Sequence, residues 1–180
     1  MKEQTFPLPP AIRFGIEEEQ TAAAKWRFNC GPGALCGLLE MTPDQIKPYL
    51  GDFERKGYTN PKLMGDILKR LGAEYQTSQL TWPNFGLVRV QWEGPWTLPG
   101  VPLRKRYRHT HWVACCRYPT LMNVFIFDIN AVYAGGWIAL RTWHKYLVPW
   151  ILKQCEPQAN GQYSVTHKWE IITRISEKII

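Results

Sequence analysis

The sequence predicts an α+β fold in which helices in the N-terminal part pack on an antiparallel β-sheet formed by the C-terminal part. Three observations lead to this class. Apolar residues recur at helical spacing up to about residue 75. Alternating and short continuous apolar runs, which are typical of strands, follow from residue 87 onward. The chain has 180 residues, of which 45% are hydrophobic, and this suits one domain with a sizeable core.

The N-terminal helices are predicted by capping residues and by apolar spacing. Three of them are expected, each between a start signal and a stop signal: 30–40, 42–50 and 60–71. Residues 1–19 carry prolines and three glutamates, and we interpret them as an N-terminal arm, so that 20–180 forms a single domain. Residues 20–25 suit either a helix or a lead-in loop.

The C-terminal strands are predicted by apolar runs bounded by turn residues. Three strands and then a closing strand pair are expected: 87–92, 112–117, 124–128, 162–165 and 169–173. A hairpin turn over 118–123 joins the second strand to the third, and a turn at 166–168 joins the closing pair. A short helix over 142–147 is expected to break or kink at Pro149.

The composition narrows the class of protein. The formal net charge of +7 favours acidic partners, although a diffuse excess is more typical of solubility than of nucleic-acid binding. No apolar run approaches the length of a membrane span, and residues 1–7 lack the apolar segment of a signal peptide. Five cysteines are an odd number in a chain large enough to fold without disulfides. We therefore expect a cytoplasmic protein with free thiols.

Cys30 lies where a turn-rich stretch meets the predicted helix 30–40. The first turn of a helix carries unpaired N–H groups and the positive end of the helix dipole, so a thiolate placed there is stabilised. Pro32 fits the first turn, and Gly31 and Gly33 keep bulk away from the sulfur. The alternative is a structural cysteine in a glycine-rich turn, because free cysteines are often inert and buried.

A cysteine nucleophile needs a base, and the base needs a group that orients it. His111 opens the predicted strand 112–117, and Asp128 ends the next strand, 17 residues later. If these strands pair as a hairpin, their outer ends meet, and Asp128 can reach His111 and fix its tautomer. His109 is the alternative base, and Asn130 is the alternative orienting residue.

The segments Asn-Cys-Gly-Pro-Gly-Ala-Leu at 29–35, His-Trp-Val-Ala at 111–114 and Phe-Asp-Ile-Asn at 127–130 resemble the papain-like cysteine peptidases. The likeness is greatest to the bacteriocin-leader peptidase branch and its phage and bacterial relatives, and it covers roughly residues 20–150. The resemblance implies a papain-like fold. It also implies Cys30 as the nucleophile, His111 as the general base and then acid, and Asp128 as the orienting residue.

The sequence departs from this family at the oxyanion hole. Family members carry a Gln five or six residues before the cysteine, where this chain has Lys25 and Ala24. The candidates for the missing amide donor are Asn29, beside the nucleophile, and Gln20, further upstream. Loss of one such donor typically lowers the rate about 10²–10³-fold.

Three functions follow from these residues. The first is a thiol hydrolase, a peptidase or amidase that forms an acyl-enzyme on a peptide or protein substrate. The second is a binding protein on the same fold, without catalysis, that grips an acidic protein or nucleic acid. The third is an acyl or glutaminyl transferase with the same triad.

The basic run 104–108 is typical of a solvated loop, but it leads directly to the histidines, and this position also suits an acidic peptide, phosphate or nucleic acid as ligand. Arg104, Arg106 and Trp112 are therefore the candidates for substrate binding. A zinc site on His109 and His111 is an alternative, but the chain has no Cys-x-x-Cys pair to complete it. We expect no metal and no cofactor.

Overall fold

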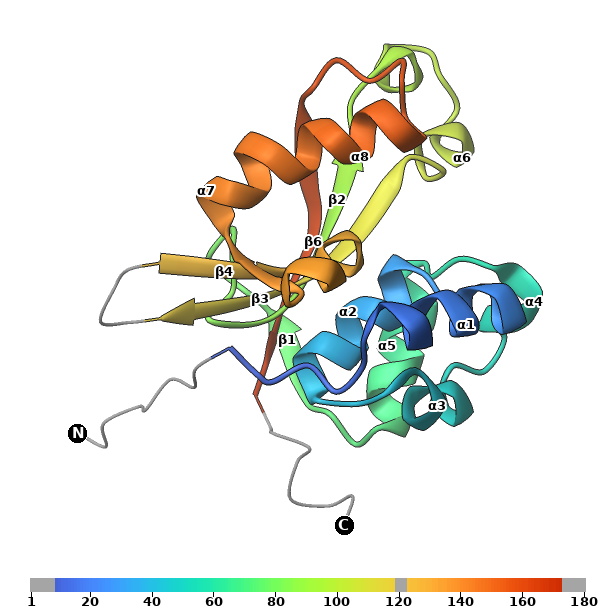
Figure 1. The fold of residues 1–180 in the computed structure, drawn as a ribbon. Helices are drawn as coiled ribbons and strands as arrows, with labels where there is room; N and C mark the ends of the chain where they lie inside the picture. Colours follow the sequence, from blue (N-terminus) through green and yellow to red (C-terminus); the bar gives the residue numbers. More distant parts are fainter. Residues whose placement is uncertain (1–8, 119–122, 173–180) are drawn as a thin grey trace.

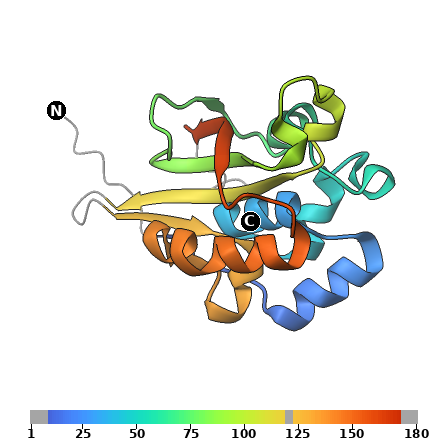
Figure 2. The ribbon, with the colours of Figure 1, turned by 90° about the horizontal axis from the view of Figure 1, so that it is seen from above.

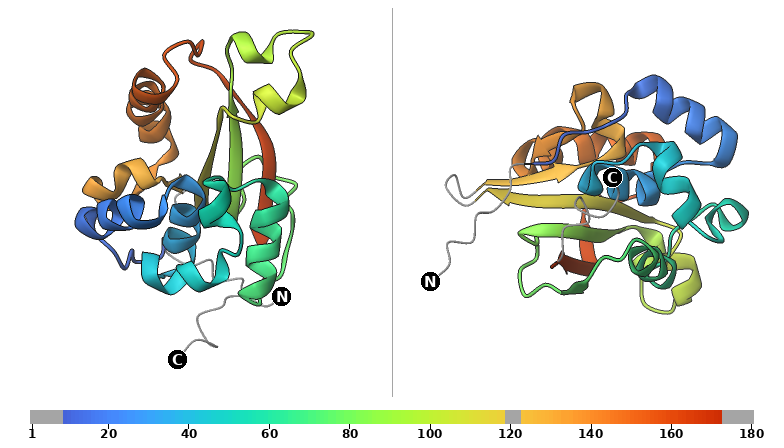
Figure 3. Two further views of the ribbon diagram at one scale, coloured as in Figure 1. Left: turned by 90° about the vertical axis from the view of Figure 1, so that its right-hand side faces the viewer. Right: turned by 90° about the horizontal axis from the view of Figure 1, so that it is seen from below.

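A computed structural model of the chain describes residues 9–118 and 123–172. Within these ranges the architecture is mixed α/β, with helices and a six-stranded antiparallel sheet in the order β1-β6-β2-β3-β4-β5. The helices of the N-terminal part gather at one end of the strands, and the last helix lies at the other end (Figure 1 and Figure 3). Seen from above, the strands form a twisted layer with this last helix along one side of it (Figure 2).

The helical segments follow the chain in this order: α1 (Ile16–Trp26), α2 (Cys30–Leu39), α3 (Pro43–Ile46), η1 (Lys47–Tyr49), α4 (Phe53–Lys56), α5 (Pro61–Arg70), η2 (Pro95–Thr97), α6 (Leu103–Arg106), η4 (Ile129–Ala134), α7 (Leu140–Thr142), η5 (Trp143–Leu147) and α8 (Val148–Cys155). The predicted caps of the early helices are confirmed. Thr42 forms a capping box with Gln45, and Asn60 accepts a hydrogen bond of 2.8 Å from the Leu63 N–H.

The strands are β1 (Tyr75–Thr77), β2 (Phe85–Trp92), β3 (Thr110–Tyr118), β4 (Asn123–Phe127), β5 (Trp137–Ala139) and β6 (Tyr163–Ile171). The pairing of β3 with β4 is as expected, and it extends to Tyr118 opposite Asn123. The turn residues predicted between them, 119–122, lie outside the described residues. This pairing fixes where the end of β4 lies relative to the start of β3.

Two buried clusters cover the two faces of the sheet. Alternate residues of the central strands, such as Leu87 and Ala114, pack with α1, α2 and α5. Their neighbours Val88 and Val113 pack with η5 and α8. Because side chains alternate between the faces of a strand and both faces are covered, β2 and β3 are buried on both sides, including the polar residues Arg89 and Gln91 of β2.

Three expectations are wrong. The predicted arm 1–19 is too long, because α1 begins at Ile16 and Phe14 is already in the core. The predicted turn at 166–168 does not exist. The single strand β6 runs through it and pairs with both β1 and β2, and the change of register falls at a bulge beside Arg89. Residue 173 of that expectation lies outside the described residues.

The third error concerns Pro149. Helical turns continue from Leu140 to Cys155 without the expected break. The segment before the proline, Trp143–Leu147, is π-helical, and Pro149 falls in the first turn of α8. Pro149 cannot donate a backbone hydrogen bond to the preceding turn, and the π-helical register of 143–147 is the local change that accommodates this loss, so the helical segment continues.

Candidate active site

Cys30 is the first residue of α2 and is half-buried. Asn29 caps the helix: its side-chain oxygen accepts a hydrogen bond of 3.3 Å from the Gly31 N–H, and its amide nitrogen donates to the Gly57 carbonyl at 3.0 Å. The thiol is therefore at the N-terminus of a buried helix, as the sequence predicts. Both polar groups of the Asn29 side chain are engaged in holding this turn.

Two glycines of α2 bring the helix very close to the end of β4. A Cβ atom on Gly33 would lie 2.8 Å from the Ile129 side chain, and one on Gly37 would lie 2.3 Å from the Phe127 ring. Phe127 and Ile129 are the two sequence neighbours of Asp128. The glycines therefore set the approach of α2 to the strand that carries the carboxylate, which differs from the predicted role of Gly33 in clearing space around the sulfur.

His111 is buried near the start of β3, with 6% of its surface exposed. Its Nε2 lies 2.9 Å from Oδ2 of Asp128, and its ring is stacked on that of Trp92 with centroids 5.9 Å apart. The Cys30 thiol and the imidazole are close enough for each to shift the pKa of the other. Because Nε2 is engaged by the carboxylate, Nδ1 is the nitrogen left for the thiol.

Asp128 is completely buried and follows the last residue of β4. Oδ2 accepts from His111 and from the Trp143 indole N–H at 2.7 Å. Oδ1 accepts from the backbone N–H and the side-chain amide of Asn130, at 3.0 and 2.9 Å. With four partners the carboxylate is fully satisfied, which is the condition for keeping a charge in a protein interior.

The imidazolium charge of His111 favours ionisation of both Cys30 and Asp128, whereas the charge of Asp128 opposes ionisation of Cys30. Burial alone would raise the pKa of the Cys30 thiol, but the charge and hydrogen bond of His111, with the Trp112 backbone N–H, outweigh it, and the pKa is lowered. Burial alone would lower the pKa of His111, but the charges and hydrogen bonds of Asp128 and Cys30 raise it well above its usual value. The arrangement therefore favours a thiolate next to an imidazolium.

The ionised state of Asp128 has the same kind of cause. Burial would raise its pKa, but the charge and hydrogen bond of His111, with the Trp143 and Asn130 hydrogen bonds, lower it. A contrast lies on the same helix as the nucleophile, where burial raises the pKa of the Cys36 thiol far above its usual value. Position beside His111 distinguishes the reactive candidate Cys30 from this inert cysteine.

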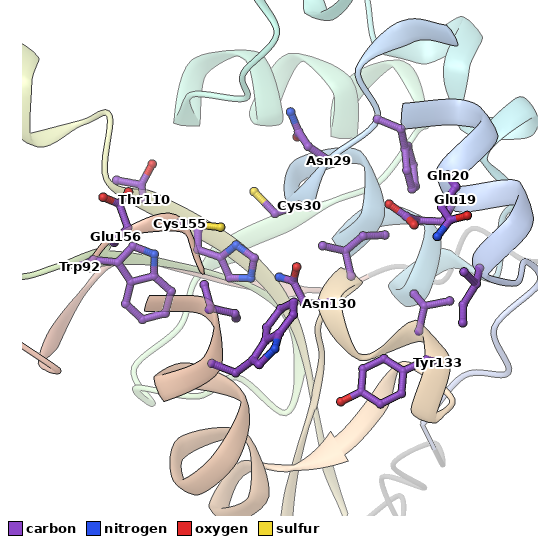
Figure 4. A pocket seen from close by; sticks show the side chains of 17 residues that line it. Glu19, Gln20, Asn29, Cys30, Trp92, Thr110, Asn130, Tyr133, Cys155 and Glu156 are labelled. Carbon is purple, nitrogen blue, oxygen red and sulfur yellow. The ribbon is translucent and has the colours of Figure 1, made fainter. Parts of the chain in front are cut away.

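Cys30 and His111 open into a pocket of about 570 Å³. Figure 4 shows Cys30 and Asn130 in its middle, Trp92 and Glu156 toward one end, and Glu19 toward the other. The lining residues come from α1, α2, β2, β3, η4 and α8: Ile16, Glu19, Gln20, Phe28, Asn29, Cys30, Trp92, Thr110, His111, Ile129, Asn130, Val132, Tyr133, Trp150, Ile151, Cys155 and Glu156.

The other predicted site residues fall into two groups. Gln20 and Asn29 line the pocket, although the Asn29 amide is engaged as described. Arg104, Arg106 and Trp112 do not line it. The indole of Trp112 is buried against the helices and donates to the Thr59 carbonyl at 2.7 Å, while Arg106 donates to the Leu98 carbonyl at 3.2 Å.

The alternatives to the triad residues have partners of their own. His109 is stacked on Trp96 with ring centroids 3.7 Å apart, and its Nδ1 lies 2.7 Å from Oε2 of Glu156. Asn130 supports Asp128 rather than replacing it. Within the described ranges, no three His, Cys, Asp or Glu side chains gather as a metal site requires.

Sequence reasoning missed three features of this site. Trp143 and Trp92 contact Asp128 and His111, and no local pattern distinguishes them from the other tryptophans. Cys155 is exposed and lines the pocket that contains Cys30. The acidic residue Glu19 lines the same pocket from α1. All three depend on contacts between segments far apart in the chain.

Comparison of the chain with protein-family models and with curated proteins finds no match. In the part of the chain that the structure describes, no helix is both long enough and apolar enough to cross a bilayer.

Proposed function

We propose that the protein is a cysteine hydrolase of the papain-like type, a peptidase or an amidase. The observation that carries this proposal is the position of His111 between the Cys30 thiol and the Asp128 carboxylate, at the mouth of a pocket. Nucleophile, base and orienting group in contact are what acyl transfer through a covalent intermediate requires. The chain order Cys, His, Asp and the helix that begins at the nucleophile agree with the family resemblance.

The reaction follows from these contacts. The Cys30 thiolate attacks the carbonyl carbon of the substrate, and the His111 imidazolium gives its proton to the departing amine as the C–N bond breaks. The resulting thioester is attacked by water, which loses a proton to His111 while the C–S bond breaks. Asp128 remains ionised and holds the imidazole in place throughout.

The oxyanion of each tetrahedral intermediate needs donors close to Cys30. The backbone N–H of Cys30 belongs to the first turn of α2, where N–H groups have no intrahelical acceptor. Of the two side chains considered for the second donor, Gln20 is the better candidate, since both groups of the Asn29 amide are engaged in hydrogen bonds. Gln20 lines the pocket from the neighbouring helix α1.

A cytoplasmic location suits this chemistry. The nucleophile has to remain a reduced thiol, and a reducing compartment keeps it so. Water as the acyl acceptor makes the protein a hydrolase, whereas an amine acceptor would make it a transferase with the same three residues. The presence or absence of an amide product on addition of an amine separates these two activities.

The test is the pH dependence of Cys30 alkylation by iodoacetamide, followed by mass spectrometry of the Cys30 peptide. The Cys155→Ser background removes the second sulfur in the pocket. We expect Cys30 to react at a pH well below that of an ordinary thiol, because His111 stabilises the thiolate. In His111→Ala the reaction should move to higher pH and become slower.

The matched control is His109→Ala, which removes an imidazole two residues away that has its own partner, Glu156. This variant should leave the alkylation profile of Cys30 unchanged. Identical profiles in the parent protein and in His111→Ala would contradict the proposed function. They would favour a binding protein on this fold.

A further inference from the structure

The pocket next to Cys30 has a charge opposite to that of the whole protein. The chain has a formal net charge of +7. Among the described residues that line this pocket are two carboxylates, Glu19 and Glu156, and no lysine or arginine. The basic residues Arg104 and Arg106, which favour an acidic substrate in the sequence, lie outside it. The pocket therefore favours a positively charged ligand, whereas the net charge of the whole protein favours an acidic one.

The two carboxylates are not equivalent. Glu156 is engaged by His109 through a contact of 2.7 Å. The Glu19 carboxylate makes no hydrogen bond or ion pair with any residue in the described ranges, and partial burial raises its pKa above the ordinary value. A carboxylate that has lost part of its hydration without gaining a cation is stabilised by a ligand that supplies one.

Exposed apolar side chains line the same pocket as Glu19. Tyr133 is 70% exposed, Trp150 is 49% exposed and Ile16 is 42% exposed, so none of these three large side chains is buried in the core. Figure 4 shows Glu19 and Tyr133 on the same side of Cys30, away from Glu156. Aromatic faces beside a carboxylate are suited to a long side chain with an apolar stem and a cationic head.

We propose that this end of the pocket binds a lysine or arginine side chain of a peptide substrate, with Glu19 as the partner of the cation and Tyr133 against the aliphatic stem. This inference rests on the proposed function, because it names the substrate class of the same site. It predicts selection for basic residues in a peptide whose reacting carbonyl lies at Cys30. The acidic substrate that the basic run 104–108 favours is not the one that this pocket fits.

The experiment uses three sets of peptidyl vinyl sulfones, which trap a reactive cysteine by addition of its thiolate to the vinyl carbon. The sets carry lysine, norleucine or glutamate, scanned over the three residues before the electrophile. The rate of Cys30 modification is measured by mass spectrometry in the Cys155→Ser background. At one position we expect the lysine peptide to react about tenfold faster than the norleucine peptide, as one charge-assisted contact allows.

Two substitutions at Glu19 test the source of this preference. Glu19→Gln should bring the lysine and norleucine rates together, and Glu19→Lys should make the glutamate peptide the fastest of the three. Glu17→Gln is the matched control. It removes the same charge from the same helix, but Glu17 is exposed and does not line the pocket, so the preference should remain.

The failures of the two proposals are distinguishable. Equal reaction of the three peptides at every position, or a lysine preference that survives Glu19→Gln and Glu19→Lys, would overturn the cationic subsite and leave the hydrolase intact. No reaction of Cys30 with any of the peptides would contradict the proposed function and the subsite together.

Discussion

Two histidine–carboxylate pairs lie two residues apart at the start of β3, and only one of them lies beside the Cys30 thiol. His111 pairs with Asp128 at 2.9 Å, and His109 pairs with Glu156 at 2.7 Å. Each ring is also stacked on a tryptophan, Trp92 or Trp96. By distance and by partner type the two pairs are nearly alike, so these criteria alone do not identify a catalytic residue.

The difference lies in what surrounds each pair. The side chains of His111 and Asp128 are 7% and 0% exposed, whereas those of His109 and Glu156 are 26% and 17% exposed. Asp128 is also held by Trp143 and Asn130, and the other nitrogen of His111 is left for Cys30. A buried, fully bonded carboxylate fixes the imidazole far better than a partly solvated one, because water cannot compete for it.

The largest expected effect separates the two histidines by activity. His111→Ala should lower kcat/KM for a peptide substrate by about 10⁴-fold or more, since removal of a triad member leaves little of the catalysis. His109→Ala should change it less than tenfold, because this ring contacts Trp96 and Glu156 rather than Cys30. Hydrolysis of a fluorogenic peptide measures both. Equal losses of kcat/KM in the two variants would contradict the distinction between His111 and His109.

The next effect separates the two carboxylates by stability. Asp128→Ala leaves buried donors of His111, Trp143 and Asn130 without an acceptor, and we expect it to lower the free energy of unfolding by about 3–5 kcal/mol. Glu156→Ala removes one partly exposed ion pair and should cost about 1 kcal/mol or less. Urea unfolding followed by tryptophan fluorescence measures both values. If Glu156→Ala lowered the free energy of unfolding as much as Asp128→Ala does, burial would not explain the difference between the two pairs.

The smallest effect is a dependence of stability on pH. The pKa of His111 is raised in the folded protein, so its protonated form stabilises the fold. That contribution is fully present below the unfolded value of about 6.5 and is lost as the pH rises through the raised pKa. The difference in unfolding free energy between the parent protein and His111→Gln should therefore be larger at pH 6 than at pH 10.

The control for this pH series is the same measurement on His109→Gln, with Cys30→Ala as a second reference. Cys30→Ala removes one of the two negative partners of His111, so the loss of stability should begin at a lower pH. A difference between the parent protein and His111→Gln that grows with increasing pH would contradict the charge assignment of the site.

Much of the fold could be predicted because its signals are local. The caps at Thr42 and Asn60, the glycine-rich start of α2 and the apolar runs of β2 to β4 lie within single segments. The polar residues at 166–168 predict a turn in the middle of β6, although the strand is continuous. The stretch 163–171 nevertheless contains no glycine or proline, and this was the available signal for one continuous strand.

The candidate site was also predictable only where its signals are local. Cys30, His111 and Asp128 each lie at the end of an element, and the pairing of β3 with β4 follows from a short connection, so their convergence could be inferred. The positions of Trp143 and Glu19 could not be, since each depends on how a distant helix packs against the sheet. The charge of the pocket is for this reason a property of the fold rather than of any segment.

The close packing of α2 against β4 depends on the absence of a Cβ atom at two glycines of α2, and the position of the Cys30 sulfur depends on this packing. Gly33 and Gly37 are one and two turns along the helix from Cys30, yet any methyl group added there would meet Ile129 or Phe127 and push the helix outward. Such a change is expected to move Cys30 away from His111 without altering the chemical identity of Cys30, His111 or Asp128. Laboratory evolution of this chain should therefore hold these two positions fixed even when the selection is for a new substrate.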